Sequence, residues 1–224
     1  MLSPAIEDYL KSIYKLQSAG GDGAGVSTSQ IAEAMSVTPA SASKMLKRLA
    51  HMRLVDYKAY QGATLTSAGT DIAVEIIRHH RLLETYLREV MGYDWDQMHA
   101  EAEQLEHHIS EDFEDRIDSL LGYPTHDPHG DPIPTREGVF SETPCAPLTA
   151  KHAGQRVRVV RLADQTPERL RVLELAGLLP GRIVNIEAVA ESDSLLARDD
   201  EASTHQIEPD VARAVLVEVL KGEG

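Results

Sequence analysis

Two imidazoles and two carboxylates recur at helical spacing between residues 99 and 107. His99, Glu103, Glu106 and His107 occupy positions i, i+4, i+7 and i+8, so one predicted helix projects all four from the same face. Burying such groups without protons, partners or a metal is costly. Hydrogen-bonded core histidines and a solvated charged face are the alternatives. The intervening apolar residues form no stripe broad enough to bury the helix alone, which favours metal binding.

Two further segments offer donors of the same kind. His80 and Glu84 lie at i and i+4 of an upstream predicted helix. Asp8, near the start of the chain, is the obvious ligand from outside this helix pair, although it also suits a solvated helix face beside Glu7.

The types of donor narrow the choice of ion. Carboxylates and imidazoles without thiolates favour hard to borderline divalent ions such as Mn²⁺ and Fe²⁺. Mn²⁺ binds most weakly in its row, so its sites need oxygen ligands. Cys145 is the only cysteine, which excludes an internal disulfide and a cysteine-rich zinc site.

The elements that must position these residues begin with a DNA-binding pattern. Ser3-Pro4 resembles an N-cap followed by a first helical residue, and Pro39 suits the start of a later helix. Gln61-Gly62 lies between two alternating runs, as in a hairpin. The expected elements are a helix from 4 to about 16, a Gly-rich loop over 20–25, a short helix over 30–35 capped by Ser27 or Ser29, a helix from 39 to about 52, and strands over 55–60 and 63–66. This order predicts a winged helix-turn-helix.

The rest of the chain predicts a helical region and then a small β domain. Helices are expected from 68 to about 91 after Ser67, from about 94 with Asp94 and Gln97 as a capping box, and from Ser110 to about 121. The segment 123–148 holds six of the eleven prolines, which predicts an extended linker. Short β-like runs over 156–160, 183–187 and 214–219, with a helix over 167–175, are typical of a small β-barrel.

These elements define the expected fold class, which is mainly α (α+β). The expected domains are 1–70 for DNA binding, 71–140 for metal binding and dimerisation, 141–153 as a linker and 154–224 as an SH3-like β-barrel.

Composition limits the partners. A formal net charge of −14 argues against nonspecific nucleic-acid binding by the whole molecule. Between residues 41 and 60, however, there are five basic residues (Lys and Arg) and one acidic residue, Asp56. This local excess of positive charge indicates a DNA-binding surface confined to one region. No apolar run approaches the roughly 18 residues of a membrane span, and the N-terminus lacks a signal-peptide pattern. We therefore expect a cytoplasmic protein with no membrane partner.

The chain resembles the diphtheria toxin repressor and manganese transport regulator family over essentially its whole length. The order of winged helix, paired metal helices, Pro-rich segment and small β domain carries the resemblance. The most specific motifs are Ile6-Glu-Asp-Tyr-Leu-Lys-Ser-Ile-Tyr14, His79-His-Arg-Leu-Leu-Glu84, the stretch 99–108, and Asp127-Pro-His-Gly-Asp-Pro-Ile-Pro134.

The resemblance implies two metal sites. The family's primary site falls on Asp8, Glu103, Glu106 and His107. Its ancillary site falls on His80, Glu84 and His99, with Asp164 and Glu168 as looser matches in the C-terminal domain. Asp8 and Glu103 stand where iron-responsive members carry Met and Cys, as in manganese-responsive members. The chain departs from the short manganese regulators in having Lys11 in place of a second carboxylate, which favours the separate ancillary site.

The same resemblance makes the helix that begins at Pro39 a recognition helix. At its N-terminal end, side chains can reach base edges or phosphates; these are Thr38, Pro39, Ser41, Ser43 and Lys44. Lys47 and Arg48 are better phosphate candidates, and the wing at Tyr60, Gln61 and Gly62 is expected to touch the minor groove or backbone. A solvated polar helix surface is the alternative for each residue.

The implied function is a metal-activated, homodimeric transcriptional regulator that represses metal-uptake genes when Mn²⁺ is sufficient. Two rival hypotheses are a winged-helix regulator with a non-metal ligand and a di-metal carboxylate enzyme. The enzyme would need Glu-x-x-His on two helices, whereas the spacing here is Glu-x-x-x-His. We therefore expect no catalytic residues.

Overall fold

The computed structural model describes residues 2–20, 25–58, 61–141, 143–190, 192–199 and 203–220. The chain divides into two compact units, and each is described by itself. Unit 1 comprises Met1–Leu83, Glu103–Arg116 and Pro134–Phe140, whereas unit 2 comprises Glu84–Ala102, Ile117–Ile133 and Ser141–Gly224. Helices α4 (Ser67–Glu89), α5 (Trp95–Leu105) and α6 (Glu111–Leu120) contribute residues to both units.

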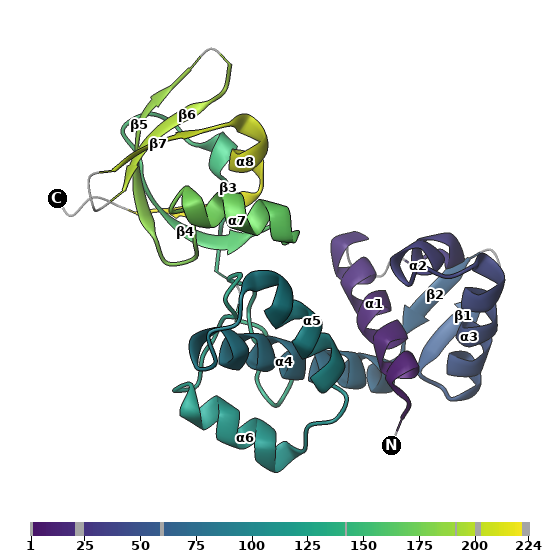
Figure 1. Ribbon diagram of the computed structural model, residues 1–224. Coiled ribbons are helices and arrows are strands. Elements are labelled where there is room, and N and C mark those ends of the chain that lie inside the picture. Colours follow the sequence, from purple (N-terminus) through teal and green to yellow (C-terminus); the bar gives the residue numbers. More distant parts are fainter. Residues whose placement is uncertain are drawn as a thin grey trace. The chain divides into compact units, whose positions relative to one another are not determined.

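Unit 1 contains the winged helix-turn-helix expected from the sequence (Figure 1). Its elements are α1 (Pro4–Gly20), α2 (Thr28–Ala34), α3 (Pro39–His51), β1 (Val55–Lys58) and β2 (Gly62–Leu65). Ser27 forms a capping box with Gln30 at the start of α2, and the Thr38 side chain accepts from the Ser41 amide at the start of α3. The caps and the proline at the first helical position therefore set where both helices begin.

The wing is a short antiparallel hairpin that pairs Val55 with Leu65 and Lys58 with Gly62. Gly62 has a φ of +93°, and a Cβ there would lie 2.5 Å from the Val26 carbonyl oxygen, so the position requires glycine. The predicted hairpin is confirmed. Tyr60, expected at its tip, lies outside the described residues, as do residues 21–24 of the Gly-rich loop.

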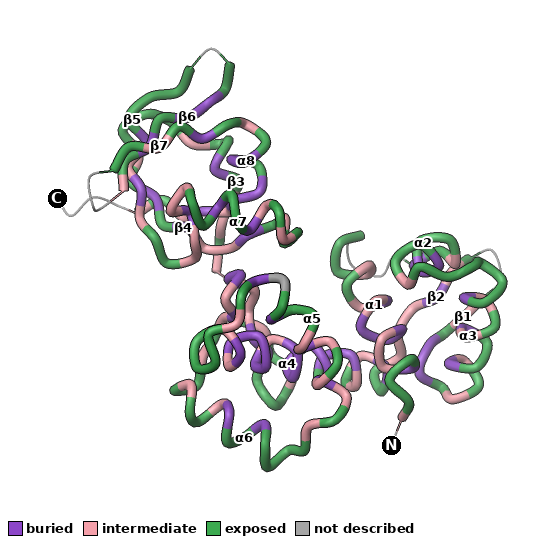
Figure 2. Tube along the Cα trace, viewed as in Figure 1, coloured by how far each residue is buried: buried purple, intermediate pink, exposed green. Residues whose placement is uncertain are grey.

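Helix α4 is most buried between Ile76 and Leu87, and Figure 2 shows several buried stretches along it. The helix ends near Gly92, whose φ of +71° is the left-handed conformation that favours glycine. Besides apolar residues, α4 carries four charged or titratable side chains into the interior, namely Arg78, His79, His80 and Glu84. Each of them needs a polar partner there.

The predicted four-residue stripe on one helix is wrong in its second half. Helix α5 ends at Leu105, and the His108 amide closes a turn onto the Leu105 carbonyl at 2.9 Å. Glu106 and His107 therefore lie in that turn, while His99 and Glu103 are on the helix. The helix therefore ends just before two of the four predicted ligands of the stripe.

Unit 2 contains the C-terminal β domain, an antiparallel sheet of order β3-β8-β4-β5-β6-β7. Its elements are β3 (Ala146–Pro147), η1 (Leu148–Ala150), β4 (Arg156–Leu162), α7 (Pro167–Leu175), β5 (Ile183–Val189), β6 (Leu195–Asp199), β7 (Thr204–Ile207), α8 (Pro209–Arg213) and β8 (Val215–Val219). The fold class is confirmed as helical domains followed by an SH3-like sheet. Strands β6 and β7 and helix α8 were not predicted from the sequence. Residues 127–134, predicted as part of an extended linker, are mostly buried.

Candidate metal centres

Three of the predicted ligands meet in unit 1. Asp8 of α1 and Glu106 and His107 of the turn after α5 each present one donor atom, and the three atoms lie within 4.8 Å of one another. The Asp8 Oδ1 oxygen is 2.9 Å from His107 Nε2, and Glu106 Oε1 is 3.5 Å from the same nitrogen. We call these three residues cluster 1. Two segments almost one hundred residues apart therefore share one group of donors.

Glu7 orients the imidazole of His107. Its Oε2 oxygen is 2.7 Å from Nδ1, on the opposite side of the ring from Asp8. A carboxylate at one ring nitrogen fixes the tautomer, so the other nitrogen presents its lone pair to an ion. From the sequence, Glu7 was only a neighbour of Asp8 on a helix face, and this contact with His107 was not predicted.

Lys11 carries a positive charge into the same region. The Nζ ammonium donates to Glu106 Oε1 at 2.6 Å and to Glu103 Oε1 at 2.9 Å. Lys11 is 5% exposed and Glu106 is fully buried. Glu103, predicted as a direct ligand, is thus joined to cluster 1 through Lys11. Burial raises the pKa of Asp8, while His107 and Lys11 act in the opposite direction.

Two histidines of α4 hold Glu106 in place. His80 Nδ1 lies 2.6 Å from Glu106 Oε2, and His79 Nδ1 lies 3.1 Å from the Glu106 carbonyl oxygen. The structure therefore places His80 beside the predicted primary site. The grouping of His80 with Glu84 came from their helical spacing, and the grouping of both with His99 came from the resemblance.

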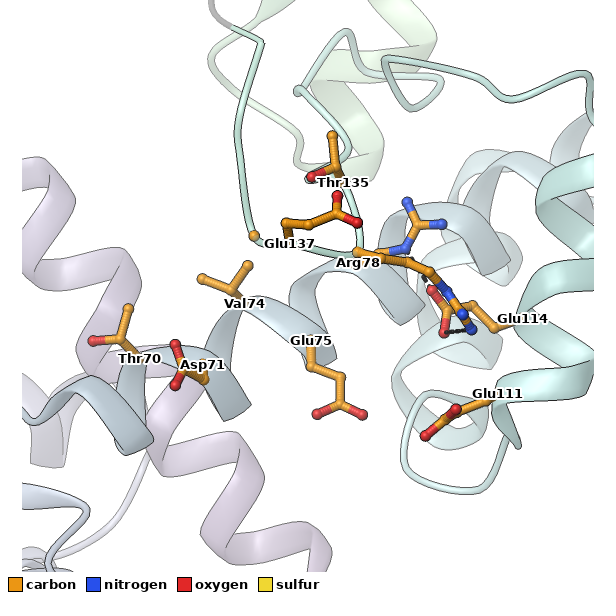
Figure 3. A pocket seen from close by; sticks show the side chains of 11 residues that line it. Thr70, Asp71, Val74, Glu75, Arg78, Glu111, Glu114, Thr135 and Glu137 are labelled. Atoms are coloured by element: carbon orange, nitrogen blue, oxygen red, sulfur yellow. Dashed lines mark hydrogen bonds and ion pairs between the residues drawn. The ribbon is translucent and has the colours of Figure 1, made fainter.

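A buried ion-pair network supports these histidines from α6. Arg78 pairs with Glu114 and also donates to the Pro134 carbonyl at 2.8 Å, beside a cavity of about 490 Å³ (Figure 3). Burial alone would raise the pKa of Glu114, but His79 and Arg78 outweigh it and hold that pKa at about 2. The network fixes α4 against α6 and thereby positions His79.

A second group of donors lies in unit 2. Glu84, Asp127 and His129 each offer one atom within 4.8 Å of the others, and all three residues are buried. We call them cluster 2. The Nδ1 atom of His129 has no hydrogen-bond partner among the described residues, and the nearest carboxylate oxygens lie 3.5 Å away on Glu84 and 3.9 Å away on Asp127.

The electrostatics of cluster 2 centre on His129. Burial opposes its protonation, but Asp127 and Glu84 raise the pKa of His129 to about 10. Burial also raises the pKa of Asp127, and the nearby carboxylate of Glu84 acts in the same direction, whereas His129 acts against both. His99 approaches the same glutamate, with Nδ1 at 2.8 Å from Glu84 Oε1. Of the predicted ancillary residues, the structure thus pairs Glu84 with His99.

The loop that supplies Asp127 and His129 is fixed onto the β domain. The Asp127 Oδ1 oxygen accepts from the amides of His129 and Asp131, both at 2.9 Å, and the His129 carbonyl accepts from Leu162 at 2.8 Å. A Cβ at Gly130 would lie 2.0 Å from the Val160 carbonyl, which leaves room only for glycine. The sequence motif Asp127-Pro-His-Gly-Asp supported the family resemblance, but neither Asp127 nor His129 was predicted as a ligand from it.

The single tryptophan of the chain borders cluster 2. The Trp95 ring lies 5.3 Å from the His129 ring between centroids, and its indole N–H donates to Glu174 of α7 at 3.2 Å. Arg88 stacks 4.5 Å over Trp95 and pairs with Glu174 at 2.8 Å. Trp95 is therefore a natural reporter of this site.

The two loosely matched ligands of the C-terminal domain lie at the start of α7. The Asp164 carboxylate accepts hydrogen bonds from the backbone N–H and the hydroxyl of Thr166, and it pairs with Arg169 at 3.5 Å. The two Thr166 donors, and then Arg169, lower the pKa of Asp164. Glu168 is exposed in the first turn of α7. Among the described residues, neither belongs to a group of three close metal-type donors.

The expected DNA-contacting residues share the exposed face of α3. Thr38, Pro39, Ser41, Lys44, Lys47 and Arg48 are exposed, whereas Ser43 is half-buried. The Ser43 hydroxyl lies 3.1 Å from the hydroxyl of Tyr57 in β1, which the sequence analysis missed. The cationic side chains are thus free of the core and available to phosphates.

The donor sets of both clusters fit a divalent cation. Ligand atoms bound to one ion at about 2.1 Å stand about 3 to 4 Å apart, close to the spacings found here. Oxygen and imidazole donors suit Mn²⁺ or Fe²⁺. The orphaned nitrogen of His129 and the Glu7-oriented ring of His107 both present a nitrogen to such an ion.

The chain matches three family descriptions along its length. Residues 1–63 match the "Iron dependent repressor, N-terminal DNA binding domain", residues 66–135 match its "metal binding and dimerisation domain", and residues 146–219 match the FeoA domain.

Among characterised relatives, the chain is similar to the HTH-type transcriptional regulator MntR of Bacillus subtilis strain 168. The identity is 37% over 55% of this chain and 84% of the relative. The MntR of Oceanobacillus iheyensis is also 37% identical, over 55% of this chain and 81% of that protein.

Solved structures resemble the chain over nearly its full length. One, a "Manganese-dependent transcriptional repressor complex with manganese", is 36% identical, covers 96% of this chain and 100% of its own, and has a TM-score of 0.84. The manganese regulator SloR is 30% identical over 98% of this chain and 100% of its own, with a TM-score of 0.70. The chain therefore belongs to the iron-dependent repressor family of metal-dependent transcriptional regulators, the family that its sequence resembles.

Proposed function

We propose that the protein is a manganese-responsive, homodimeric DNA-binding repressor, in which the ion in cluster 1 fixes the DNA-binding domain against the helical domain. Fe²⁺ and other divalent transition ions are secondary candidates. The relatives support this reading, since they include MntR regulators and a repressor solved with manganese.

One observation carries the proposal. Asp8 belongs to α1, which packs into the winged helix, whereas Glu106 and His107 follow α5. One ion held by all three residues would link α1 to the turn after α5, two segments that lie almost one hundred residues apart in the sequence. Ordering the DNA-binding domain before it meets DNA lowers the cost of binding, which couples the two sites.

Each residue has a part in this mechanism. Asp8, Glu106 and His107 would hold the ion, and Glu103 would join them if Lys11 released it. Glu7 keeps the His107 ring oriented, while His79 and His80 fix the Glu106 turn. The ion supplies two positive charges that offset the carboxylates at this junction.

We assign cluster 2 as a second, ancillary metal site. Glu84, Asp127 and His129 would be its ligands, with His99 within reach of Glu84. This assignment replaces His80 as an ancillary ligand, because His80 contacts Glu106. Since the loop of Asp127 and His129 is bonded to β4, an ion here would stabilise the attachment of the β domain.

The exposed face of α3 would contact operator DNA. Lys44, Lys47 and Arg48 would meet phosphates, while Thr38, Pro39, Ser41 and Ser43 lie at the end of the helix that reaches base edges. The dimerisation-domain match supports a homodimer, with residues 1–70, 71–140 and 154–224 as the three domains and 141–153 as the linker.

We further propose a cytoplasmic location and no enzymatic activity. The single cysteine suits a reducing compartment, and the family consists of transcription regulators. None of the described helices is long and apolar enough to cross a membrane.

The proposal is tested by operator binding at fixed salt, with Mn²⁺ or with excess chelator. We expect Mn²⁺ to tighten binding by about 5- to 150-fold, the usual range for coupling between two sites. A scrambled duplex at the same salt controls for nonspecific binding. Equally tight operator binding in chelator would contradict the proposal.

A further inference from the structure

The Lys11 ammonium binds the same carboxylate oxygen of Glu106 that a metal ion in cluster 1 would use as a ligand. This ammonium is the donor closest to Glu106 Oε1, at 2.6 Å, and Oε1 is also the Glu106 oxygen that faces His107 Nε2. The same ammonium holds Glu103 Oε1 at 2.9 Å. The charge that balances these two carboxylates is therefore already present within the chain.

Two cations at one carboxylate oxygen repel each other strongly in a buried site. Glu106 is fully buried and Lys11 nearly so, which weakens screening by water. An ion that takes Glu106 Oε1 as a ligand must therefore push the Lys11 ammonium away from it.

A cavity beside cluster 1 is large enough to hold the Lys11 ammonium after it is displaced. About 440 Å³ of space is lined by Asp8, Lys11 and Glu103, and on its other side by the end of α2 at Ala34, Met35 and Ser36. Lysine has a flexible four-carbon stem, so its ammonium can change partners while the backbone of α1 stays in place. The space leads from cluster 1 to the turn that precedes the recognition helix.

We propose that Lys11 is a tethered counter-ion, which competes with the metal ion for Glu106 and moves into this cavity when the ion binds. This inference rests on the proposed function, because it concerns the affinity of cluster 1. Lys11 neutralises the carboxylates when metal is scarce, and it raises the metal concentration at which the site fills. Its displaced charge lies beside the α2–α3 turn, so ion occupancy changes the electrostatics next to α3.

The test compares Mn²⁺ binding to the full-length protein by electron paramagnetic resonance in wild type, Lys11→Met and Lys15→Met. Lys15 lies one turn further along α1 and lines the same cavity, which makes it a matched control. We expect Lys11→Met to bind Mn²⁺ at least about tenfold more tightly, since a neighbouring charge shifts a carboxylate's affinity for a proton by a comparable factor. Lys15→Met should stay within about twofold of wild type.

A second measurement needs no variant and so does not depend on whether Lys11→Met folds. Reductive methylation of the wild type, followed by peptide mass spectrometry, reports how accessible each ammonium is. We expect Lys11 to be modified slowly without metal and several times faster with Mn²⁺, while the rate at Lys15 changes little.

The outcomes separate the two claims. Unchanged or weaker Mn²⁺ binding by Lys11→Met, or equal methylation of Lys11 with and without Mn²⁺, overturns the counter-ion role and leaves the proposed function standing. Failure of the wild type to bind Mn²⁺ at all contradicts the proposed function itself.

Discussion

Clusters 1 and 2 offer an ion the same types of donor but balance their charge in different ways. In cluster 1 the carboxylate of Glu106 is paired with Lys11, a residue of α1 whose ammonium also holds the adjacent Glu103. In cluster 2 the balancing cation is the protonated His129, itself one of the candidate ligands. An ion must therefore displace an ammonium from cluster 1 and a proton from cluster 2.

The difference predicts two kinds of response. Cluster 1 should be sensitive to substitution of its lysine, and its donors come from segments far apart in the sequence. Cluster 2 should be sensitive to pH, and its donors lie on α4 and on a loop fixed to the β domain. Site-specific variants can therefore separate sensing at the DNA-binding domain from stabilisation of the β domain.

The largest effect should come from Glu106→Gln. The substitution keeps the shape but removes the charge that contacts Lys11 and faces His107. We expect Mn²⁺ binding at cluster 1 to weaken by at least about 100-fold, which exceeds the usual loss from an outer-shell residue. Electron paramagnetic resonance measures it, with the exposed Glu111→Gln as control. An affinity within about threefold of wild type would remove Glu106 from the ligand set.

Asp127→Asn should act on cluster 2 alone. An asparagine oxygen can still accept from the amides of His129 and Asp131, so the loop is expected to keep its shape. Mn²⁺ is paramagnetic, so we expect an ion in cluster 2 to quench the fluorescence of Trp95, whose ring lies 5.3 Å from that of His129. In Asp127→Asn we expect roughly 10- to 100-fold weaker binding at cluster 2 and loss of this quenching. Asp131→Asn, in the same loop, should leave the quenching intact. Quenching that persists in Asp127→Asn would argue against the site.

Glu7→Gln should have a smaller effect, confined to cluster 1. Removing the carboxylate that orients His107 weakens metal binding through the ring, and we expect about a tenfold loss of Mn²⁺ affinity. Calorimetry can measure it, with Trp95 quenching as the check that cluster 2 is unchanged. Equal losses at both clusters would indicate a general loss of structure.

The smallest change to the molecule is the loss of one proton from His129. Because the pKa of His129 is raised to about 10, the ring is protonated near neutral pH in the metal-free protein and must lose that proton to bind an ion. Affinity at cluster 2 should therefore rise with pH, by at most about tenfold per unit, until the pH reaches that pKa. Calorimetry in buffers of different ionisation enthalpy should show release of about one proton, absent in Asp127→Asn. Release of none would contradict a protonated His129.

Much of the fold could be predicted because its signals are local. The serine and threonine caps, Pro39 and the Gln61-Gly62 turn act within a few residues, and the winged helix followed from them. Strands β6 and β7 were missed because they are short, five and four residues, and give little alternation to detect. The helix containing the predicted ligand stripe ended earlier than its periodicity suggested.

The candidate sites were only partly predictable, since their contacts are not local. The donor types of Asp8, Glu106 and His107 were apparent, but Glu7 meets His107 across one hundred residues. Lys11 was noted as a departure, yet its contact with Glu106 depends on how α1 packs. Asp127 and His129 were hidden in a Pro-rich segment whose burial no periodic pattern reveals.

The most direct test of the central claim is a Mn²⁺ titration of the wild type with and without operator duplex. Coupling between two sites is reciprocal, so if Mn²⁺ in cluster 1 orders the DNA-binding domain, the operator must tighten Mn²⁺ binding by the same factor. We predict tightening by the factor that Mn²⁺ confers on operator affinity. Mn²⁺ affinity that is the same with and without the operator would contradict the account.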